Sequence, residues 1–340
     1  MTAPALAATA QRPGEPLLVV DDLRVRFATE DGPVHAVNGV SFTLGAGEIL
    51  AIVGESGCGK SVTAMAIPGL LPPTATVEGS IRLAGTDLLT LSQRELRAVR
   101  GKEVSFVFQE PMTSLNPAFT VGRQIREVLQ RHEGLSKKAA QERAVELLDL
   151  VRIPAPRKRV DEYPHQLSGG MRQRVMIAIG VACGPKVLVA DEPTTALDVT
   201  IQAGVLDIMR DLRTQLGTAI ILITHDLGVV ADLADRVVVM YAGRPVEQAE
   251  VHELFAHPQH PYTNGLLRAV PHREEGVEAV SQRRLAEIPG LVPSLRSDPD
   301  LCVFAPRCPR STAECVERRP PLAPTRPAHP TACYHPGEGA

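Results

Sequence analysis

Residues 49–61 read Ile-Leu-Ala-Ile-Val-Gly-Glu-Ser-Gly-Cys-Gly-Lys-Ser, an apolar run followed by the pattern GxxxxGKS. The continuously apolar run 49–53 is typical of a strand in a parallel sheet that helices cover on both faces. The glycines let the following loop fold tightly, so that its N–H groups and the next helix N-terminus converge on a phosphate. Because a strand precedes the loop and a helix-compatible stretch follows it, we interpret it as a phosphate-binding loop (P-loop) rather than a chance turn.

The side chains of the P-loop predict how it binds a nucleotide. Lys60 supplies a positive charge to the β- and γ-phosphates of ATP, and Ser61 supplies a hydroxyl to Mg²⁺. Cys58 is either a redox-sensitive thiol beside the phosphates or a small residue that fills space, and we favour the second interpretation. The predicted backbone contacts to the phosphates lie at Gly54, Gly57 and Gly59.

Two other apolar runs end in polar residues. Asp191 and Glu192 follow the run 187–190, and His225 follows the run 220–224. Ligands bind at the carboxyl ends of strands in an open parallel sheet, so these side chains should meet near the P-loop. We expect Asp191 to hold Mg²⁺, Glu192 to deprotonate the attacking water and His225 to contact the γ-phosphate. The alternatives are a helix-capping acid and a structural histidine.

The rest of the chain predicts an α/β fold, because strand and helix patterns alternate as in a doubly wound parallel sheet. Leu23, Val25 and Phe27 alternate with charged residues and predict a half-buried strand, and 37–44 predicts another. Apolar residues at helical spacing from Ala144 to Val151 predict a helix. We expect a disordered tail over 1–16, a nucleotide-binding domain over 17–262 and an extension over 263–340, which is rich in Pro, His, Arg and Cys.

Composition restricts the class of protein. The 340 residues are 44% apolar and 22% charged, as in ordinary globular proteins. A net charge of −3 argues against a broad nucleic-acid-binding face. No apolar run approaches the roughly 18 residues of a membrane span, and the N-terminus lacks the features of a signal peptide. We therefore expect a cytoplasmic chain, which is still able to dock onto membrane subunits.

Four of the six cysteines lie in the last forty residues with the spacing C-x5-C-x6-C-x17-C. The tight C-x2–4-C pair of structural zinc sites is absent, and long irregular gaps with a Cys-Pro favour a [4Fe–4S] cluster. We predict such a cluster, with Zn²⁺ as the alternative, and favour a structural role over a redox sensor. Its ligands would be Cys302, Cys308, Cys315 and Cys333.

The sequence Leu-Ser-Gly-Gly-Met-Arg-Gln at 167–173, before an apolar helix over 175–183, resembles the signature motif of ATP-binding-cassette (ABC) ATPases. The remaining motifs follow in that family's order. The resemblance implies the P-loop NTPase fold of that family, with an antiparallel β subdomain, a helical signature subdomain and a Cys-rich C-terminal extension. The resemblance implies that Gln109 is the Q-loop glutamine near Mg²⁺, that Asp198 belongs to the D-loop and that His225 is the switch histidine. It also implies that Phe27 stacks on adenine, although a core phenylalanine is an equal alternative.

The signature motif implies a dimer. A serine and two glycines at a helix start form a second anion site, which needs a phosphate from another chain. In the family two domains pack head to tail, so that Ser168 and Gly170 of one reach the γ-phosphate held by Lys60 of the other. ATP then closes the dimer and hydrolysis reopens it.

Four further segments are similar to the oligopeptide/dipeptide permease ATPases: 110–117, 163–166, 260–262 and 288–293. Related ATPases carry a [4Fe–4S] cluster in this extension. The resemblance implies the transport-coupled ATPase of a bacterial importer for di- and oligopeptides, or alternatively for nickel chelates or glutathione-like peptides. It implies a peripheral position on the cytoplasmic face of the cell membrane, with residues 109–117 beneath a permease. The implied partners are two permease subunits, a second related ATPase and an extracytoplasmic peptide-binding protein, with no nucleic acid.

Three other functions fit less well. Cassette ATPases that act on nucleic acid carry a long insertion between the P-loop and the signature, where this chain has only about a hundred residues, and translation factors carry two cassettes. A regulatory protein with a dead site is disfavoured because Lys60, Asp191, Glu192 and His225 are all present. An exporter is disfavoured by the absence of fused membrane spans and by the extension.

Overall fold

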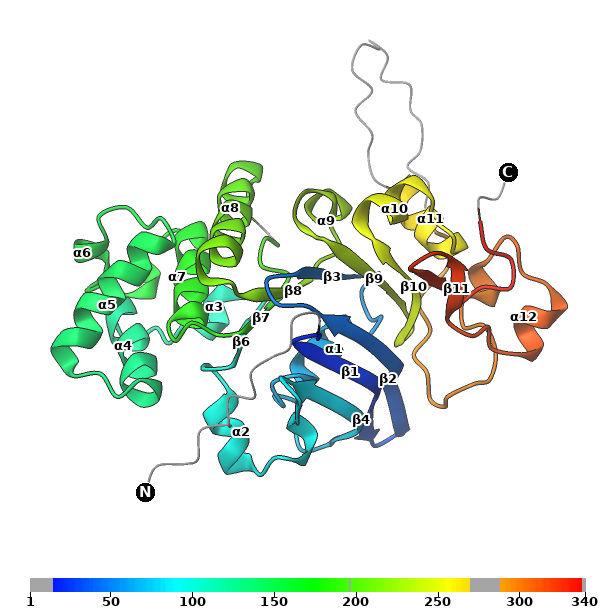
Figure 1. The fold of residues 1–340 in the computed structure, drawn as a ribbon, viewed down its shortest axis with the longest axis horizontal. Coiled ribbons are helices and arrows are strands. Elements are labelled where there is room, and N and C mark those ends of the chain that lie inside the picture. Colours follow the sequence, from blue (N-terminus) through cyan, green and yellow to red (C-terminus); the bar gives the residue numbers. More distant parts are fainter. Residues whose placement is uncertain (1–14, 196, 270–287, 338–340) are drawn as a thin grey trace, which may run out of the picture.

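The computed structural model describes residues 15–195, 197–269 and 288–337, so the predicted tail over 1–16 falls almost wholly outside the described residues. The chain forms two sheets with helices around them (Figure 1). The smaller sheet has the strand order β2-β1-β4-β5 and is antiparallel throughout. Its strands are β1 (Leu18–Thr29), β2 (Gly32–Leu44), β4 (Ala75–Leu83) and β5 (Thr86–Asp87). Both strands predicted in this region are present and longer than expected.

The larger sheet has the strand order β11-β12-β10-β9-β3-β8-β7-β6, and its buried residues form one hydrophobic core with those of the smaller sheet. Strands β9, β3, β8, β7 and β6 are parallel neighbours, and every residue of β3, β7 and β8 is buried. The three apolar runs of the sequence therefore form central strands. The strands are β3 (Ile49–Val53), β6 (Val104–Val107), β7 (Val187–Asp191), β8 (Ala219–Ile223), β9 (Arg236–Tyr241), β10 (Arg244–Glu250), β11 (Ala323–Arg326) and β12 (His329–Thr331).

A group of helices extends from one end of the large sheet, and other helices cover the sheet (Figure 1). The predicted helix over 144–151 is part of α5, where Ser136 caps the N-terminus and Ala144, Leu147 and Leu148 are buried. The helices are α1 (Lys60–Ala66), α2 (Gln93–Val99), α3 (Pro111–Ser114), α4 (Val121–His132), α5 (Lys137–Leu150), α6 (Pro156–Arg159), α7 (Gly169–Val181), α8 (Val199–Leu216), α9 (Leu227–Leu233), α10 (Val251–Ala256), α11 (Pro261–Arg268) and α12 (Ala313–Glu317). Within the described residues, none of these helices has the length and apolarity needed to cross a bilayer.

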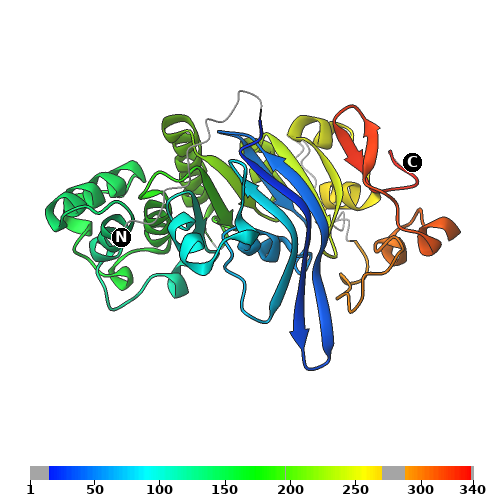
Figure 2. The ribbon, with the colours of Figure 1, turned by 60° about the horizontal axis from the view of Figure 1, so that its bottom comes forward.

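The C-terminal extension is built onto the large sheet. Strand β12 pairs antiparallel with β10, where Glu247 lies opposite Thr331, and β11 pairs with β12. Figure 2 shows this hairpin beside the helices that follow β10. The prediction of a doubly wound parallel sheet is thus incomplete, because three antiparallel strands extend one edge. The predicted boundary between 262 and 263 falls inside α11.

Candidate active site

The P-loop links β3 to α1 and encloses the ammonium group of Lys60. Lys60 Nζ donates to the carbonyl oxygens of Gly54 at 2.8 Å and Glu55 at 2.9 Å. The side chain is buried, and this burial lowers the pKa of Lys60. A buried ammonium that is satisfied only by neutral carbonyls is well placed to exchange them for phosphate oxygens, which bear charge.

Two glycines of the P-loop are required by close backbone contacts. A Cβ atom at Gly54 would lie 2.3 Å from the Met240 carbonyl oxygen, and one at Gly59 would lie 2.3 Å from the Ala36 carbonyl oxygen. Their φ angles of 150° and 89° also favour glycine. The loop is therefore seated directly on β9 and β2. Gly57, at φ 81°, has open space beside it, where a ligand can approach.

Cys58 points inward from the P-loop. Its side chain is fully buried, and its Sγ lies 3.9 Å from the hydroxyl of Tyr262. Burial raises the pKa of the Cys58 thiol, which disfavours the reactive thiolate. The interpretation of Cys58 as a space-filling residue therefore agrees with its surroundings.

Strand β7 ends in the two acids, which face different groups. Asp191 Oδ1 accepts a hydrogen bond from Ser61 Oγ at 3.1 Å. Burial raises the pKa of Asp191, while the Ser61 hydroxyl acts in the opposite direction. A carboxylate and a hydroxyl next to a phosphate-binding loop are oxygen donors of the kind that Mg²⁺ prefers. The two residues therefore fit the predicted magnesium site.

Three side chains surround the carboxylate of Glu192. Gln109 Nε2 donates to Oε2 at 2.9 Å, Thr195 Oγ1 donates to Oε2 at 2.8 Å, and His225 Nδ1 lies 3.3 Å from Oε1. Gln109 follows β6 and His225 follows β8, the two strands that flank β7. The structure thus brings together Gln109, Glu192 and His225 as predicted. Thr195 was not among the predicted residues, because its only signal in the sequence is a hydroxyl three residues after the acid.

Glu192 has an unusual backbone conformation. Its φ is +45°, and its N–H donates to the carbonyl of Ile223 at 2.9 Å at the end of β8. A non-glycine residue in the left-handed region is uncommon and carries strain that the surrounding structure must support. This conformation turns the carboxylate toward Gln109 and His225 instead of continuing the strand.

The signature and D-loop residues lie elsewhere. Ser168 caps α7 and accepts from the N–H of Met171 at 3.4 Å, and Asp198 caps α8 and accepts from the N–H of Ile201 at 2.9 Å. A Cβ on Gly170 would lie 2.4 Å from Ile201 Cγ2, so the two segments pack together. Figure 1 places α7 and α8 apart from α1, the helix that follows the P-loop.

Phe27 lies on β1, at some distance in the sequence from the other site residues. It is half-buried and pairs with Val34 on β2 and Ala75 on β4. It also packs against the hydrophobic core. This position is compatible with both alternatives, a residue that stacks on adenine and a core phenylalanine.

The four C-terminal cysteines gather around one small pocket, together with His260 and Phe304. The N–H of Cys302 donates to the carbonyl of Cys315 at 2.8 Å. Burial raises the pKa of Cys302 and Cys308, and raises that of Cys333 to about 11, which favours neutral thiols. Over 15–195, 197–269 and 288–337, no group of His, Cys, Asp or Glu has a metal-holding arrangement. The structure therefore does not support the predicted [4Fe–4S] cluster or zinc.

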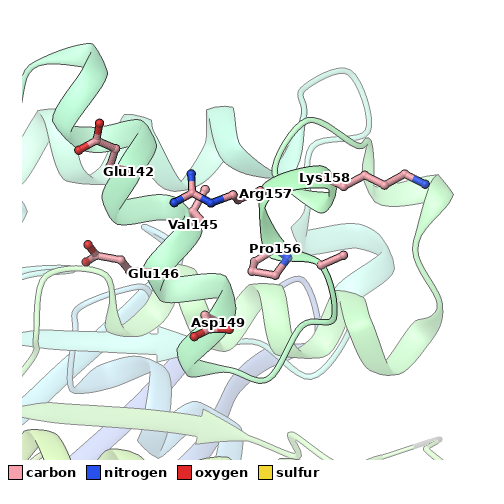
Figure 3. Close-up of a pocket in the computed structure, with 8 residues that line it drawn as sticks. Glu142, Val145, Glu146, Asp149, Pro156, Arg157 and Lys158 are labelled. Carbon is pink, nitrogen blue, oxygen red and sulfur yellow. The ribbon is translucent and has the colours of Figure 1, made fainter.

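A surface pocket of about 640 Å³ lies between α5 and α6 (Figure 3). Its walls carry both signs of charge, from Glu142, Glu146 and Asp149 on one side and Arg157 and Lys158 on the other. It contains none of the predicted site residues. Since no histidine, hydroxyl or thiol side chain lines it, the chemistry is better assigned to the P-loop and the edge of the sheet.

Comparisons with known proteins agree with this site. The family described as "ABC transporter" matches residues 37–195, and "Oligopeptide/dipeptide transporter, C-terminal region" matches residues 246–315. The probable peptide ABC transporter ATP-binding protein y4tR of Sinorhizobium fredii is 53% identical over 95% of this chain and 96% of its own. The oligopeptide transport ATP-binding protein OppD of Salmonella typhimurium is 51% identical over 98% of this chain and 97% of its own.

Solved structures of similar fold cover the nucleotide-binding part. The dimeric ABC transporter cassette MJ0796, bound to ADP and Pi, has a TM-score of 0.62 at 27% identity and covers 69% of this chain and 98% of its own. The cbiO1 protein of Clostridium perfringens has a TM-score of 0.60 at 29% identity and covers 71% of this chain and 91% of its own. The resemblance stated from the motifs is confirmed: the chain belongs to the ATP-hydrolysing, ATP-binding proteins of the oligopeptide/dipeptide group of ABC transporters.

Proposed function

We propose that this chain powers a bacterial importer of di- and oligopeptides by binding and hydrolysing ATP. The observation that carries the proposal is the carboxylate of Glu192 at the end of β7, held by Gln109 and His225 from the strands on either side. The magnesium-type pair consists of Ser61, in the helix that follows the P-loop after β3, and Asp191, the last residue of β7. The peptide cargo is supported by relatives at about half identity that are named for peptide transport.

Each residue of the site has a separate role in the proposed reaction. Lys60 exchanges its loop carbonyls for the β- and γ-phosphates, and the backbone at Gly57 and Gly59 approaches them closely. Ser61 and Asp191 would hold Mg²⁺, which would neutralise charge on the phosphates. Glu192 then accepts a proton from the attacking water. Gln109 and His225 hold the Glu192 carboxylate in place, and each can turn toward a phosphate or the metal when nucleotide binds.

The cycle requires two ATPase chains. Ser168 is exposed at the N-terminus of α7. Figure 1 places α7 apart from α1, the helix that follows the P-loop, so the phosphate that Ser168 contacts would come from a partner. We infer a head-to-tail pair, formed with a related ATPase, in which Ser168, Gly170 and Asp198 face the opposite P-loop. ATP closes the pair and hydrolysis reopens it. The similar solved cassette is itself dimeric, which supports this arrangement.

The proposed setting is the cytoplasmic face of the cell membrane, beneath two permease subunits that receive cargo from a peptide-binding protein. The segment 109–117 supports this setting. Gln109, Glu110, Thr113, Ser114 and Asn116 are all exposed, although Gln109 also contacts Glu192. A permease helix resting on this segment would sense the γ-phosphate through Gln109.

The proposed cofactors are ATP and Mg²⁺ only. The [4Fe–4S] cluster is left out of this function, because the described thiols lack a metal-holding arrangement. If anaerobically purified protein contained iron and acid-labile sulfide, and Cys308→Ser lost both, the [4Fe–4S] prediction would be supported after all. Stoichiometric zinc without sulfide would support a zinc site instead.

The test is uptake of labelled di- and oligopeptides by native cells that carry Glu192→Gln on the chromosome. Hydrolysis should slow by about 10²–10⁴-fold while ATP binding is retained, because the carboxylate acts on water and not on the phosphates. Uptake should therefore be lost. The matched control is Glu133→Gln, at a surface ion pair with Lys102.

Each alternative result has a distinct meaning, once redundant peptide transporters have been deleted. If hydrolysis were lost but peptide uptake stayed normal, the cargo would be nickel chelates or another small solute instead of peptides. Near-normal hydrolysis would show that a group other than Glu192 acts as the general base.

A further inference from the structure

Glu55, the second residue of the P-loop, is held at three points. Its carboxylate accepts from both terminal nitrogens of Arg307, at 2.8 Å and 3.0 Å. Its N–H donates to the hydroxyl of Tyr262 at 2.7 Å, and its carbonyl accepts from Lys60 Nζ at 2.9 Å. Two of the three contacts come from the C-terminal part of the chain, and the third comes from the lysine that binds phosphate.

The guanidinium of Arg307 is fully occupied. Besides Glu55, it donates through Nε to the carbonyl of Pro289 at 2.8 Å, and through Nη2 to that of Ile288 at 2.9 Å. Its fifth hydrogen bond runs from Nη1 to the Tyr241 hydroxyl at 3.3 Å. An arginine has five N–H donors, so every one of them has a partner. The side chain is only 4% exposed, and its orientation is therefore fixed.

Tyr262 holds the loop from a second side. Its ring is fully buried and packs on the rings of Tyr241 and Phe304, with centroids 4.8 Å and 5.4 Å away. Its hydroxyl reaches both Glu55 N and Cys58 Sγ. Burial raises the pKa of Tyr262, so the hydroxyl stays protonated. The aromatic cluster thus presents one polar atom to the P-loop, at a fixed position.

We propose that Arg307 and Tyr262 are positioning residues of the ATP site, which act through Glu55 on the P-loop and Lys60. The bidentate ion pair fixes the Glu55 side chain, and the tyrosine fixes its backbone. The Glu55 carbonyl that holds Lys60 is then fixed as well. The loop is kept in a phosphate-ready shape before nucleotide arrives, which lowers the ordering cost of binding. The C-terminal extension is in this way a part of the nucleotide site.

The first test is a titration of the full chain with the nonhydrolysable analogue adenylyl imidodiphosphate and Mg²⁺. Tyr262→Phe removes only the hydroxyl, and Arg307→Lys keeps the charge but loses the two-pronged contact. Each should raise the dissociation constant roughly 2- to 10-fold, the cost of ordering one or two groups on binding. Arg318→Gln, which removes an exposed ion pair with Glu314 in the same extension, is the control and should change it less than about twofold.

A merely structural role predicts a different result. If the ion pair only attaches the extension to the fold, both variants lower the melting temperature while the dissociation constant of the folded chain stays unchanged. That outcome would overturn the proposal. Because binding of the analogue does not involve cargo or Glu192 chemistry, a failure here is distinct from a failure of the proposed peptide import.

The second test is a double-mutant cycle. Arg307→Gln should weaken binding in the wild-type background but add nothing in the Glu55→Gln background, because the arginine acts through that carboxylate. Equal losses in the two backgrounds would contradict the proposal.

The third test measures hydrolysis by the assembled transporter with Tyr262→Phe. The KM for ATP should rise while kcat stays within about twofold, since Gln109, Glu192 and His225 are untouched. A fall in kcat at unchanged KM would contradict a positioning role in binding.

Discussion

At the scale of single residues, Lys60 is buried, and the phosphates of a nucleotide can replace the two carbonyl groups that its ammonium contacts. Its ammonium donates to two carbonyls of its own loop, and burial lowers its pKa. Lys60→Ala should weaken ATP binding by roughly 10- to 100-fold, because charge-assisted hydrogen bonds to phosphate are lost. Calorimetric titration of the full chain measures this. Lys186→Ala, at a surface ion pair with Glu103, is the control and should bind like wild type.

His260 makes stability depend on pH. Its burial lowers its pKa to about 4, and neutral Nδ1 accepts the N–H of Tyr262 at 3.1 Å as the cap of α11. Glu247 and Arg310 are the charged groups that act on it, in opposite directions. In the unfolded chain the ring takes up a proton below about pH 6.5. The folded chain resists this uptake down to about 4.

Stability from His260 is therefore complete above pH 6.5 and is lost as the pH falls toward 4. The expected loss between pH 7 and pH 5 is about 2 kcal/mol in the free energy of unfolding. Urea denaturation at the two pH values tests it, with His260→Asn as the comparison, since asparagine also caps a helix but does not titrate. Equal losses in the two proteins would show that His260 does not cause the effect.

Most residues of the candidate site could be predicted from the sequence because each lies at or just after the end of a buried strand. Asp191, Glu192 and His225 follow runs of apolar residues, and parallel strands bring such ends to one edge. The role of Glu55 was not readable. Its partner Arg307 is 252 residues away, in a segment whose composition resembles a tail. A local sequence pattern cannot predict this contact, because it forms only when the C-terminal extension packs against the P-loop.

At the scale of elements, one buried carboxylate joins three segments. Glu247 of β10 is fully buried and accepts from the N–H groups of Gln259 at 2.6 Å and His260 at 2.9 Å. It also accepts from His329 Nε2 of β12 at 2.6 Å. Strand β10, the start of α11 and the C-terminal hairpin therefore meet at this side chain.

Glu247→Ala should lower the free energy of unfolding by roughly 3–5 kcal/mol, because three buried donors lose their acceptor. Chemical denaturation measures the loss. Glu250→Ala, at the exposed end of the same strand, is the control and should cost less than about 1 kcal/mol. Similar losses for the two variants would mean that Glu247 does not join these segments.

Buried central strands were predicted from the sequence, whereas the short strands at the edge of the large sheet were not. Strands β3, β7 and β8 are buried on both faces, so their runs are wholly apolar and were located within one residue. Strands β11 and β12 are only four and three residues long and contain Pro324 and Pro330. Proline disfavours strands in isolation, and these two form because β12 pairs with the edge of β10 and β11 pairs with β12.

At the scale of the whole molecule, the exposed start of α7 should act only in the pair of ATPases. Ser168→Asn keeps an acceptor for the N–H of Met171 and adds bulk where the opposite nucleotide would lie. We expect ATP binding by the isolated chain to stay within about twofold and hydrolysis by the assembled pair to fall more than tenfold. Filter binding and phosphate release measure the two quantities. Unimpaired hydrolysis would contradict the head-to-tail arrangement.

The contact between Glu55 and Arg307 also sets an order of events during synthesis. Ribosomes add about 5–20 residues per second, so the 252 residues that separate the pair take roughly 13–50 seconds to make. The nascent chain completes its phosphate loop early and receives the arginine late. The bidentate contact that holds Glu55 can therefore form only late in synthesis, after strands β3, β7, β8 and β9 have all been made.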